Sequence, residues 1–338
     1  AGMHLFSSPA IHRCNFTFNI AESRGAGVYI TGGSAQLSNT SFSSNAASSG
    51  AGLHIQNGFP IINSSTFHNN QAQHRGGAIG VGGGSPVFNS VLLSHNVAFD
   101  GGGSHTWAAE SVWNDCTIAN NSAQLAGGGL VALDAVVVIH RGLIADNQAG
   151  AVGGGCSFRS SNVTLSHSHV RNNAASEAGG GFAVDVFSSR VQIEDCVVSD
   201  NEADAAAGIL IVDGSLRLTR TSLLRNVANH QAGGVWFAGG HSQVVQCTIR
   251  QNTGSLGGGA VVEGKETIVS AVGSLVSDNR ASNDGGGLFL MSGDVDLDTV
   301  NLVSNQAGLR GGGISAADAV DPGLISSVRS LLLPGVVS

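Results

Sequence analysis

An asparagine recurs along the whole chain at a nearly constant spacing, and this repeat limits the fold more than any other feature. Twelve such residues occur, and the intervals between them average 26 residues. A period of this length is typical of solenoids, in which each repeat stacks on its neighbours. The anchoring residues are Asn19, Asn45, Asn70, Asn96, Asn121, Asn147, Asn173, Asn201, Asn226, Asn252, Asn279 and Asn305.

The residues around each asparagine alternate with a period of two. The residue three positions before the asparagine is apolar in every repeat, and the one five positions before it is small. Two further segments show the same alternation, one before this pair and one after the glycine cluster, as in Val191/Ile193 and Leu288/Leu290. Residues two apart on a strand share a face, so each repeat is expected to form three short strands.

A helical repeat is the main alternative, and the glycine content argues against it. The chain has 50 glycines, and each one inside a helix costs about 1 kcal/mol relative to alanine. Three inward-facing strands per repeat instead indicate an all-β fold, a single-stranded parallel β-helix solenoid of about twelve coils, right-handed by the general crossover preference. The asparagine amide is expected to donate to one neighbouring coil and accept from the other, which builds an Asn ladder along the axis.

The residues that flank the asparagines and the glycines carry a further signal. The segments concerned are Phe16-x-x-Asn19, Phe42-x-x-Asn45, Phe67-x-x-Asn70 and Gly76-Gly77-Ala78-Ile79. They resemble the FxxN and GGA[ILV] motifs of the polymorphic outer-membrane protein repeats. The resemblance implies a surface-displayed right-handed β-helix that is involved in adhesion. From the fourth repeat on, Leu, Ile or Val replaces the Phe, so surface display is implied and membership of the bacterial family is not.

Length, charge and cysteine spacing favour one elongated domain. Residues 1–320 are expected to form the β-helix, starting in mid-coil, and residues 321–338 a degenerate last coil or a C-terminal cap. The net charge is −8 without a basic cluster, which argues against nucleic-acid binding. No apolar run reaches the length of a membrane span. The five cysteines would lie too far apart for disulfides, so we expect buried free thiols.

The most polar column lies six and seven residues before the asparagine, where a corner is expected. Its members include His140, His167, Glu194, Asp115, Arg141 and Asp195. The first three are candidate metal ligands, and the last three are candidate acid–base groups of an enzyme that acts on acidic polysaccharides. The simpler interpretation is ion pairing between neighbouring coils, which the alternating signs of charge favour. We therefore expect no catalytic residue, no metal and no cofactor.

Five Asn-x-Ser/Thr sequons are candidate N-glycosylation sites in a eukaryotic host. Asn15 is expected to face outward, whereas Asn120 adjoins the ladder and is expected to be less accessible. The five sequons begin at Asn15, Asn39, Asn63, Asn120 and Asn162.

The outward residue between the two inward residues after each glycine cluster forms another column. Its last four members are large and apolar: Leu210, Trp236, Val261 and Phe289. Neighbouring coils lie about 4.8 Å apart, so these side chains would touch and form a strip. A contiguous strip with Trp and Phe indicates an interface with another protein or another copy of the chain. The alternative is a cover formed by the chain itself, for which residues 326–337 are a candidate.

Two hypotheses about function follow. The first is an extracellular or cell-surface structural or adhesive solenoid, displayed on a surface or forming part of a fibre. Its outer faces would bind another protein, another copy side by side or end to end, or glycans. The second is a polysaccharide lyase or hydrolase on the same scaffold, which carboxylates clustered in an outward groove would favour.

Overall fold

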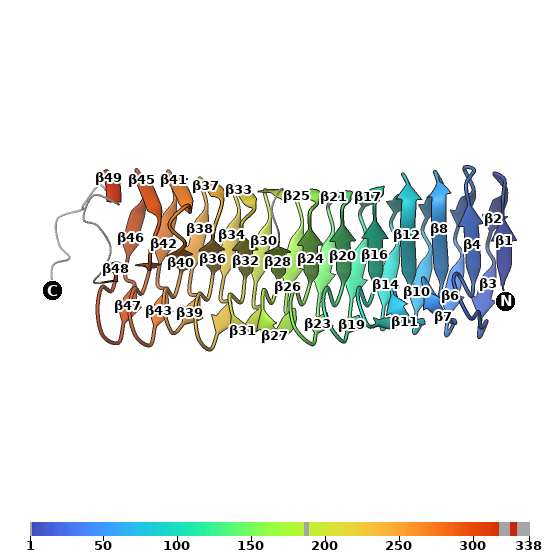
Figure 1. Cartoon of the computed structure of the whole chain (residues 1–338), viewed down its shortest axis with the longest axis horizontal. Helices are drawn as coiled ribbons and strands as arrows, with labels where there is room; N and C mark the ends of the chain where they lie inside the picture. Colours follow the sequence, from blue (N-terminus) through green and yellow to red (C-terminus); the bar gives the residue numbers. More distant parts are fainter. Residues whose placement is uncertain (1, 186–188, 318–324, 330–338) are drawn as a thin grey trace.

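The computed structural model describes residues 2–185, 189–317 and 325–329, the last of these as a backbone strand. The chain winds into a rod of stacked coils, from β1 (Met3–Leu5) at one end to β48 (Ile314–Ala316) towards the other (Figure 1). The described residues form strands and turns and contain no helix. Every strand pairs in parallel with its counterpart in the next coil, which confirms the predicted all-β solenoid of about twelve coils.

Two of the four sheets contain thirteen strands each. Sheet A follows the glycine turn of each coil and comprises β1 (Met3–Leu5), β4 (Val28–Thr31), β8 (Leu53–Gly58), β12 (Ile79–Gly84), β16 (Ser104–Trp107), β20 (Leu130–Leu133), β24 (Cys156–Arg159), β28 (Phe182–Asp185), β32 (Ile209–Val212), β36 (Val235–Ala238), β40 (Ala260–Glu263), β44 (Leu288–Leu290) and β48 (Ile314–Ala316). Sheet B comes next along each coil and comprises β2 (Ala10–His12), β5 (Gln36–Ser38), β9 (Ile61–Asn63), β13 (Val87–Asn89), β17 (Glu110–Asn114), β21 (Val136–His140), β25 (Asn162–Ser166), β29 (Arg190–Glu194), β33 (Ser215–Thr219), β37 (His241–Val245), β41 (Ile268–Val272), β45 (Asp294–Asp298) and β49 (Ile325–Arg329).

The other two sheets flank the asparagine column. Sheet C precedes it and comprises β3 (Asn15–Thr17), β6 (Ser41–Ser43), β10 (Thr66–His68), β14 (Leu92–Ser94), β18 (Thr117–Ala119), β22 (Leu143–Ala145), β26 (His169–Arg171), β30 (Val197–Ser199), β34 (Ser222–Leu224), β38 (Thr248–Arg250), β42 (Leu275–Ser277) and β46 (Asn301–Val303). Sheet D follows it and comprises β7 (Ala46–Ser49), β11 (Gln71–Arg75), β15 (Val97–Ala98), β19 (Ser122–Ala123), β23 (Gln148–Ala149), β27 (Ala174–Ala178), β31 (Glu202–Ala205), β35 (Val227–Ala228), β39 (Thr253–Gly254), β43 (Arg280–Ala281) and β47 (Gln306–Ala307).

Sheet D is the part of the coil that the sequence pattern did not predict as a strand. The pattern predicted three strands per coil, and the structure has a fourth, which is only two residues long in most coils. It contains the alanine two residues after the asparagine, and this alanine is buried, as at Ala98 and Ala123, which are 1% and 3% exposed. A two-residue strand is too short to show a period of two, which is why the pattern gave only a tight inward corner there.

The corners between sheets are made by residues in the left-handed backbone region. The residue six positions before each asparagine has a positive φ in all twelve coils, from Arg13 (53°) to Thr299 (52°), and so has the residue directly before each asparagine, from Phe18 (55°) to Ser304 (54°). This conformation is unfavourable for a residue such as Phe. It persists because hydrogen bonds to the neighbouring coils hold the strands on both sides of the corner. The predicted corner between sheets B and C is therefore present.

Sheets A, B and C turn their apolar side chains into one continuous core. In the N-terminal coils this core contains parallel aromatic rings: Phe42 and Phe67 have ring centroids 4.4 Å apart, and Phe88 and Trp113 have centroids 3.9 Å apart. In the C-terminal coils the corresponding side chains are aliphatic. There they enclose a small apolar cavity of about 40 Å³, whose lining includes Ala260 and Ala271.

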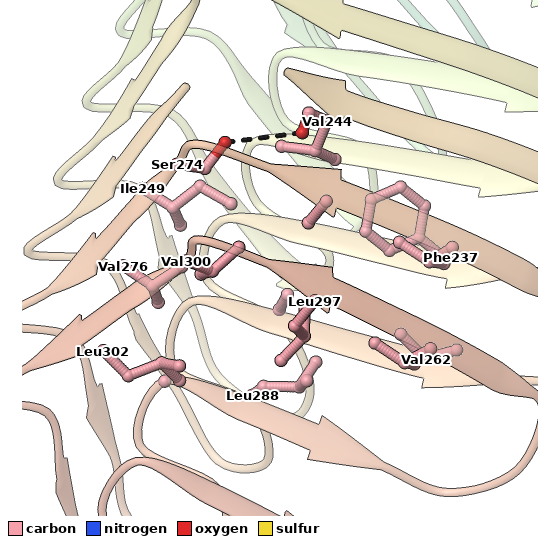
Figure 2. Close-up of a pocket in the computed structure, with 15 residues that line it drawn as sticks. Phe237, Val244, Ile249, Val262, Ser274, Val276, Leu288, Leu297, Val300 and Leu302 are labelled. Atoms are coloured by element: carbon pink, nitrogen blue, oxygen red, sulfur yellow. Dashed lines mark hydrogen bonds between the residues drawn. The ribbon is translucent and has the colours of Figure 1, made fainter. Parts of the chain in front are cut away.

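Figure 2 shows this cavity between strands of sheets A, B and C. Val276 points into it from one coil, and Leu297 and Leu302 point into it from the next. The one hydrogen bond drawn there joins the Ser274 hydroxyl, as donor, to the carbonyl of Val244 at 3.4 Å. The cavity is thus a packing gap with an apolar lining, and its size corresponds to a few missing methyl groups.

The segment expected to be a degenerate coil or cap is described only in part. Strand β49 pairs in parallel with β45, so sheet B continues into a thirteenth strand. Residues 318–324 and 330–338 lie outside the described residues.

Candidate functional site

The Asn column forms the predicted ladder inside the rod. Asn147 shows the pattern: its Nδ2 donates to Oδ1 of Asn173 at 3.0 Å and to the carbonyl of Ile118 at 2.8 Å, and its backbone N–H donates to the same Oδ1 at 3.0 Å. Its own Oδ1 accepts from Nδ2 and from the backbone N–H of Asn121, at 3.0 and 2.9 Å. All the hydrogen-bonding capacity of the amide is therefore used.

The ladder runs without a break through the rod. Consecutive asparagines from Asn19 to Asn305 are joined by Nδ2-to-Oδ1 bonds of 2.9–3.1 Å. From Asn45 to Asn279 these side chains are at most 1% exposed. Every bond points in the same direction, and hydrogen bonds in such a chain polarise one another. The ladder is thus a structural element that ligands in solvent do not reach.

The polar corner column consists of ion pairs between coils. Arg141 donates to both carboxylate oxygens of Asp115, from Nε at 2.6 Å and from Nη2 at 2.8 Å. Arg220 donates in the same two-pronged way to Asp195, at 2.8 and 2.9 Å, and also to Glu194. The ion-pair interpretation is therefore the one that the structure supports for these residues.

The electrostatics of this column do not suit acid–base catalysis. The hydrogen bonds from Arg141 and Arg220 lower the pKa of Asp115 and of Asp195, respectively. A general acid at neutral pH needs a raised pKa, so these two carboxylates lack that property. The structure does bring the two candidate histidines together, with the rings of His140 and His167 5.2 Å apart. Within the described ranges, however, no three His, Cys, Asp or Glu side chains are grouped so that they could hold a metal ion.

The predicted apolar strip is not exposed, and this expectation is wrong. Val261 is 0% exposed and Phe289 is 7% exposed, while Leu210 and Trp236 are half-buried. Val261 and Phe289 instead belong to a small second core outside sheet A, with Ala232, Trp236, Leu256, Met291 and Ala317 packed around them.

The cover over this column is the chain's own glycine turn. Each turn passes over the outward residue of the sheet A strand that follows it. At Gly257, which has a φ of 57°, an added Cβ would lie 2.5 Å from Cγ2 of Val261. Leu256, in the same turn, packs against this layer. Of the other suggested cover, residues 326–329 belong to β49 in sheet B, and residues 330–337 lie outside the described residues.

The same column opens into a recess in the N-terminal coils, and the sequence pattern missed it. Here Gly80 and Gly82 of β12 leave the outer surface of the strand without side chains. The resulting space is about 80 Å³ and is bordered by His54, Gln56, His105 and Trp107 on the neighbouring strands and by Arg24, Ser49 and Arg75 before the strands of sheet A. The available signal was a glycine between two histidines in the outward column of sheet A.

A second hollow lies on the outer face of sheet B, across β29, β33, β37 and β41. It is an open groove of about 330 Å³. Its exposed polar residues are Arg190, Gln192, Ser215, Arg217, His241 and Gln243. Arg217 donates from Nη1 to Oε1 of Gln243 at 2.9 Å, which leaves most of the hydrogen-bonding groups of the groove turned to solvent.

The sequons differ in accessibility. Asn15, Asn39, Asn120 and Asn162 are exposed, whereas Asn63 is half-buried and accepts a hydrogen bond from Nδ2 of Asn89 at 2.8 Å. The expectation that Asn120 is less accessible is wrong, because it is a corner residue with a φ of 56°, and the reversal of the chain there turns its side chain outward.

The cysteines behave as small apolar core residues. All five are free, and four of them are buried; Cys14 is half-buried. Burial raises the pKa of Cys116 and of Cys196 to about 11. Such thiols are poor nucleophiles at neutral pH.

Comparisons with known proteins agree with this architecture. Residues 95–253 match the family described as the right handed beta helix region, and residues 64–82 match the Chlamydia polymorphic membrane protein repeat. The second match contains Phe67, Asn70 and the segment from Gly76 to Ile79. No curated protein and no solved structure matches the chain. The described residues include no helix of the length and apolar character that a membrane crossing needs. The repeat match suggests a surface-associated protein, and the chain folds as a right-handed β-helix in which residues 64–82 are similar to the polymorphic membrane protein repeat.

Proposed function

We propose that the chain is an extracellular, surface-displayed adhesive rod that binds a polar polymer such as a glycan along its outer face. The groove on sheet B carries this proposal. It crosses four neighbouring coils, so its long axis follows the axis of the rod, as a bound linear chain would. Its arginine, glutamine and histidine side chains offer donors and acceptors for hydroxyl groups.

The state of the carboxylates favours binding over hydrolysis. Glycoside hydrolases generally use a pair of carboxyl groups, one of them protonated at working pH. The carboxylates raised as acid–base candidates are Asp115 and Asp195, and each is held by an arginine. The lining of the groove on sheet B, as described, contains no Asp or Glu. Association with a second protein or another copy, side by side or end to end, is part of the same proposal.

A binding assay on polysaccharides tests the adhesive function. The purified chain would be applied to a panel of immobilised polysaccharides and to fixed animal cells. The double variant Arg217→Ser/Gln243→Ser should lose most of the binding. Arg171→Ser, which removes an exposed arginine from sheet C, should bind like the parent chain. Absence of binding to every surface would contradict the proposal, and cleavage of a polysaccharide would instead support the enzyme hypothesis.

A further inference from the structure

The recess at Gly80 has the dimensions of a binding site for a small chemical group. Its volume is about 80 Å³, whereas a cavity needs about 10–15 Å³ to hold one water molecule. An added Cβ at Gly80 would lie 2.7 Å from Nδ1 of His54, and one at Gly82 would lie 3.1 Å from Oε1 of Gln56. A side chain at either position would therefore displace the neighbour that borders the recess, His54 or Gln56. Gln56 itself is held in place, because its Nε2 donates to the carbonyl of Gly82 at 2.8 Å.

A buried histidine beside this recess lacks hydrogen-bond partners. His54 is only 6% exposed, and Gln56 lies beside its ring, but neither Nδ1 nor Nε2 makes a hydrogen bond of regular geometry within the described residues. A neutral imidazole has one donor and one acceptor, and leaving both unpaired in a buried position is costly. Buried polar groups almost always have a partner, so this side chain points to an occupant of the recess.

The rim of the recess is cationic in a chain whose net charge is −8. Arg24 and Arg75 are exposed and lie on either side of Ser49, each paired with it in backbone register. Their Cα atoms are thus two strand spacings apart, about 9.6 Å, a gap that two arginine side chains can close around one anion. Nη1 of Arg24 donates to Oε1 of Gln56 at 2.9 Å, which places this guanidinium at the edge of the recess. Arg75 makes no side-chain hydrogen bond or ion pair within the described ranges.

An aromatic side chain completes the rim. Trp107 of β16 is 45% exposed and stands in register with Gly82 on the neighbouring strand. Its ring therefore borders the glycine gap, with part of its surface open to solvent. Guanidinium groups recognise carboxylates and sulfates, and an exposed indole provides a flat apolar surface with a polar edge. An acidic sugar matches both features: its charged oxyanion suits the guanidinium groups, and the apolar face of its ring suits the indole.

We propose that this recess binds the acidic group of a hexuronate or of a sulfated sugar. The oxyanion lies between Arg24 and Arg75 and accepts a hydrogen bond from the N–H of His54. The sugar ring packs against Trp107. The recess is on sheet A and the groove described above is on sheet B, so either surface can bind when the other does not.

Calorimetric titration of the intact chain with glucuronic acid, galactose 6-sulfate, inorganic sulfate and glucose tests this assignment. Glucuronic acid or galactose 6-sulfate should bind, and whichever binds more tightly identifies the acidic group. Glucose should bind at least about tenfold more weakly, because one lost charge-assisted contact corresponds to about tenfold in affinity. Failure of both acidic sugars to bind at millimolar concentration would overturn the proposal and leave a recess filled by water.

Variants separate the parts of the site. Arg75→Gln should weaken binding of the acidic sugar about tenfold, and Gly80→Ala should abolish it by displacing His54, whose Nδ1 would lie 2.7 Å from the added Cβ. Arg171→Gln is the matched control and should bind like the parent chain. Because Gly80→Ala could disturb the fold, its unfolding midpoint is measured as well; Arg75 is exposed, so Arg75→Gln remains informative in either case. Unchanged affinity in Arg75→Gln would overturn the site.

The tryptophan distinguishes a sugar from a simple ion. Trp107→Ala should weaken the acidic sugar several-fold and leave the affinity for inorganic sulfate unchanged. Equal affinities of the parent chain for inorganic sulfate and the acidic sugars, with no effect of Trp107→Ala, would overturn the assignment to a sugar. The polysaccharide assay with sheet B variants gives a separate result, so failure of one proposal does not imply failure of the other.

Discussion

The outward column of sheet A differs between the two ends of the rod, although the backbone is the same. Around β12 the column reads His54, Gly80 and His105, and around β40 it reads Trp236, Val261 and Phe289, in the same parallel register. At the first end the glycine turns leave a polar recess; at the second they close over a dry apolar layer. The repeat therefore fixes the path of the chain, and a few side chains decide whether its surface is open.

The Asn ladder does not show this variation. The Nδ2-to-Oδ1 bond of the ladder is 3.0 Å long both in the coils of the polar recess and in the coils of the apolar layer. A ladder that satisfies its own donors and acceptors makes no demand on the outward residues. The comparison thus predicts that changes in the outward column have local consequences that depend on the coil.

The largest effect is expected in the apolar layer. Phe289→Ala should lower the free energy of unfolding by about 3–5 kcal/mol, because it removes a buried aromatic ring and leaves a cavity. Chemical denaturation measures the effect, and hydrogen exchange localises it to the C-terminal coils. Phe6→Ala serves as the control, because Phe6 is 73% exposed. Equal destabilisation by the two substitutions would show that the layer is not a second core.

The polar end should be sensitive to acid in a way that the apolar end is not. Burial, aided by the charge of Arg24, lowers the pKa of His54 to about 4. The unfolded chain takes up this proton near pH 6.5, so the folded state loses stability as the pH falls from about 6.5 towards about 4. The loss should be on the order of 3 kcal/mol, since one pKa unit corresponds to about 1.4 kcal/mol.

Urea unfolding at several pH values measures this loss. In His54→Gln the fall in stability between pH 6.5 and pH 4 should be smaller. Burial, together with the charge of Arg75, lowers the pKa of His105 to about 3. Part of the loss of stability in acid should therefore remain in the variant. Identical pH profiles for the variant and the parent chain would contradict a buried neutral His54.

A smaller effect of opposite sign is expected in the C-terminal core. Ala271→Val places methyl groups in the cavity of Figure 2 and should raise stability by about 1 kcal/mol. Ala132→Val is the comparison, because Ala132 is 0% exposed in a coil nearer the middle of the rod and does not line this cavity. That substitution should destabilise through overpacking. A loss of stability in both variants would mean that the cavity is too small to fill.

The last effect concerns the reactivity of the cysteines and not the stability of the chain. A thiol reagent should modify five groups in denaturant without reductant. In the folded chain at neutral pH the buried thiols, with pKa values of about 11 at Cys116 and Cys196, should react slowly. Fewer than five reactive groups in denaturant would reveal a disulfide.

The parts of the structure that repeat could be predicted from the sequence, because a column of identical residues has one physical explanation. The Asn ladder and the inward pairs of sheets A, B and C are of this kind. Corner residues such as Phe18, with a φ of 55°, were not predictable by residue type, since Phe disfavours this conformation and neighbouring coils impose it. The short strands of sheet D left no periodic signal.

The outer surface was harder to predict for a different reason. The alternation correctly identified Val261 and Phe289 as outward-facing in sheet A, yet they are buried, because a turn from the same coil covers them. Such a contact between a loop and a strand face has no periodic signature. The recess at Gly80 was missed for the related reason that it is defined by absent side chains.

The most direct test of the account is the stability of Asn173→Ala against Asn162→Ala. Asn173 accepts from the backbone N–H of Asn147 at 3.0 Å and donates to the carbonyl of Ile144 at 3.0 Å, and each group left unpaired costs about 1–3 kcal/mol. Asn162 is exposed in the same region, and its substitution should change stability by less than about 0.5 kcal/mol. Urea unfolding should therefore show a clear drop in midpoint for Asn173→Ala alone. Equal midpoints for the two variants would contradict the central claim that the ladder holds the coils together.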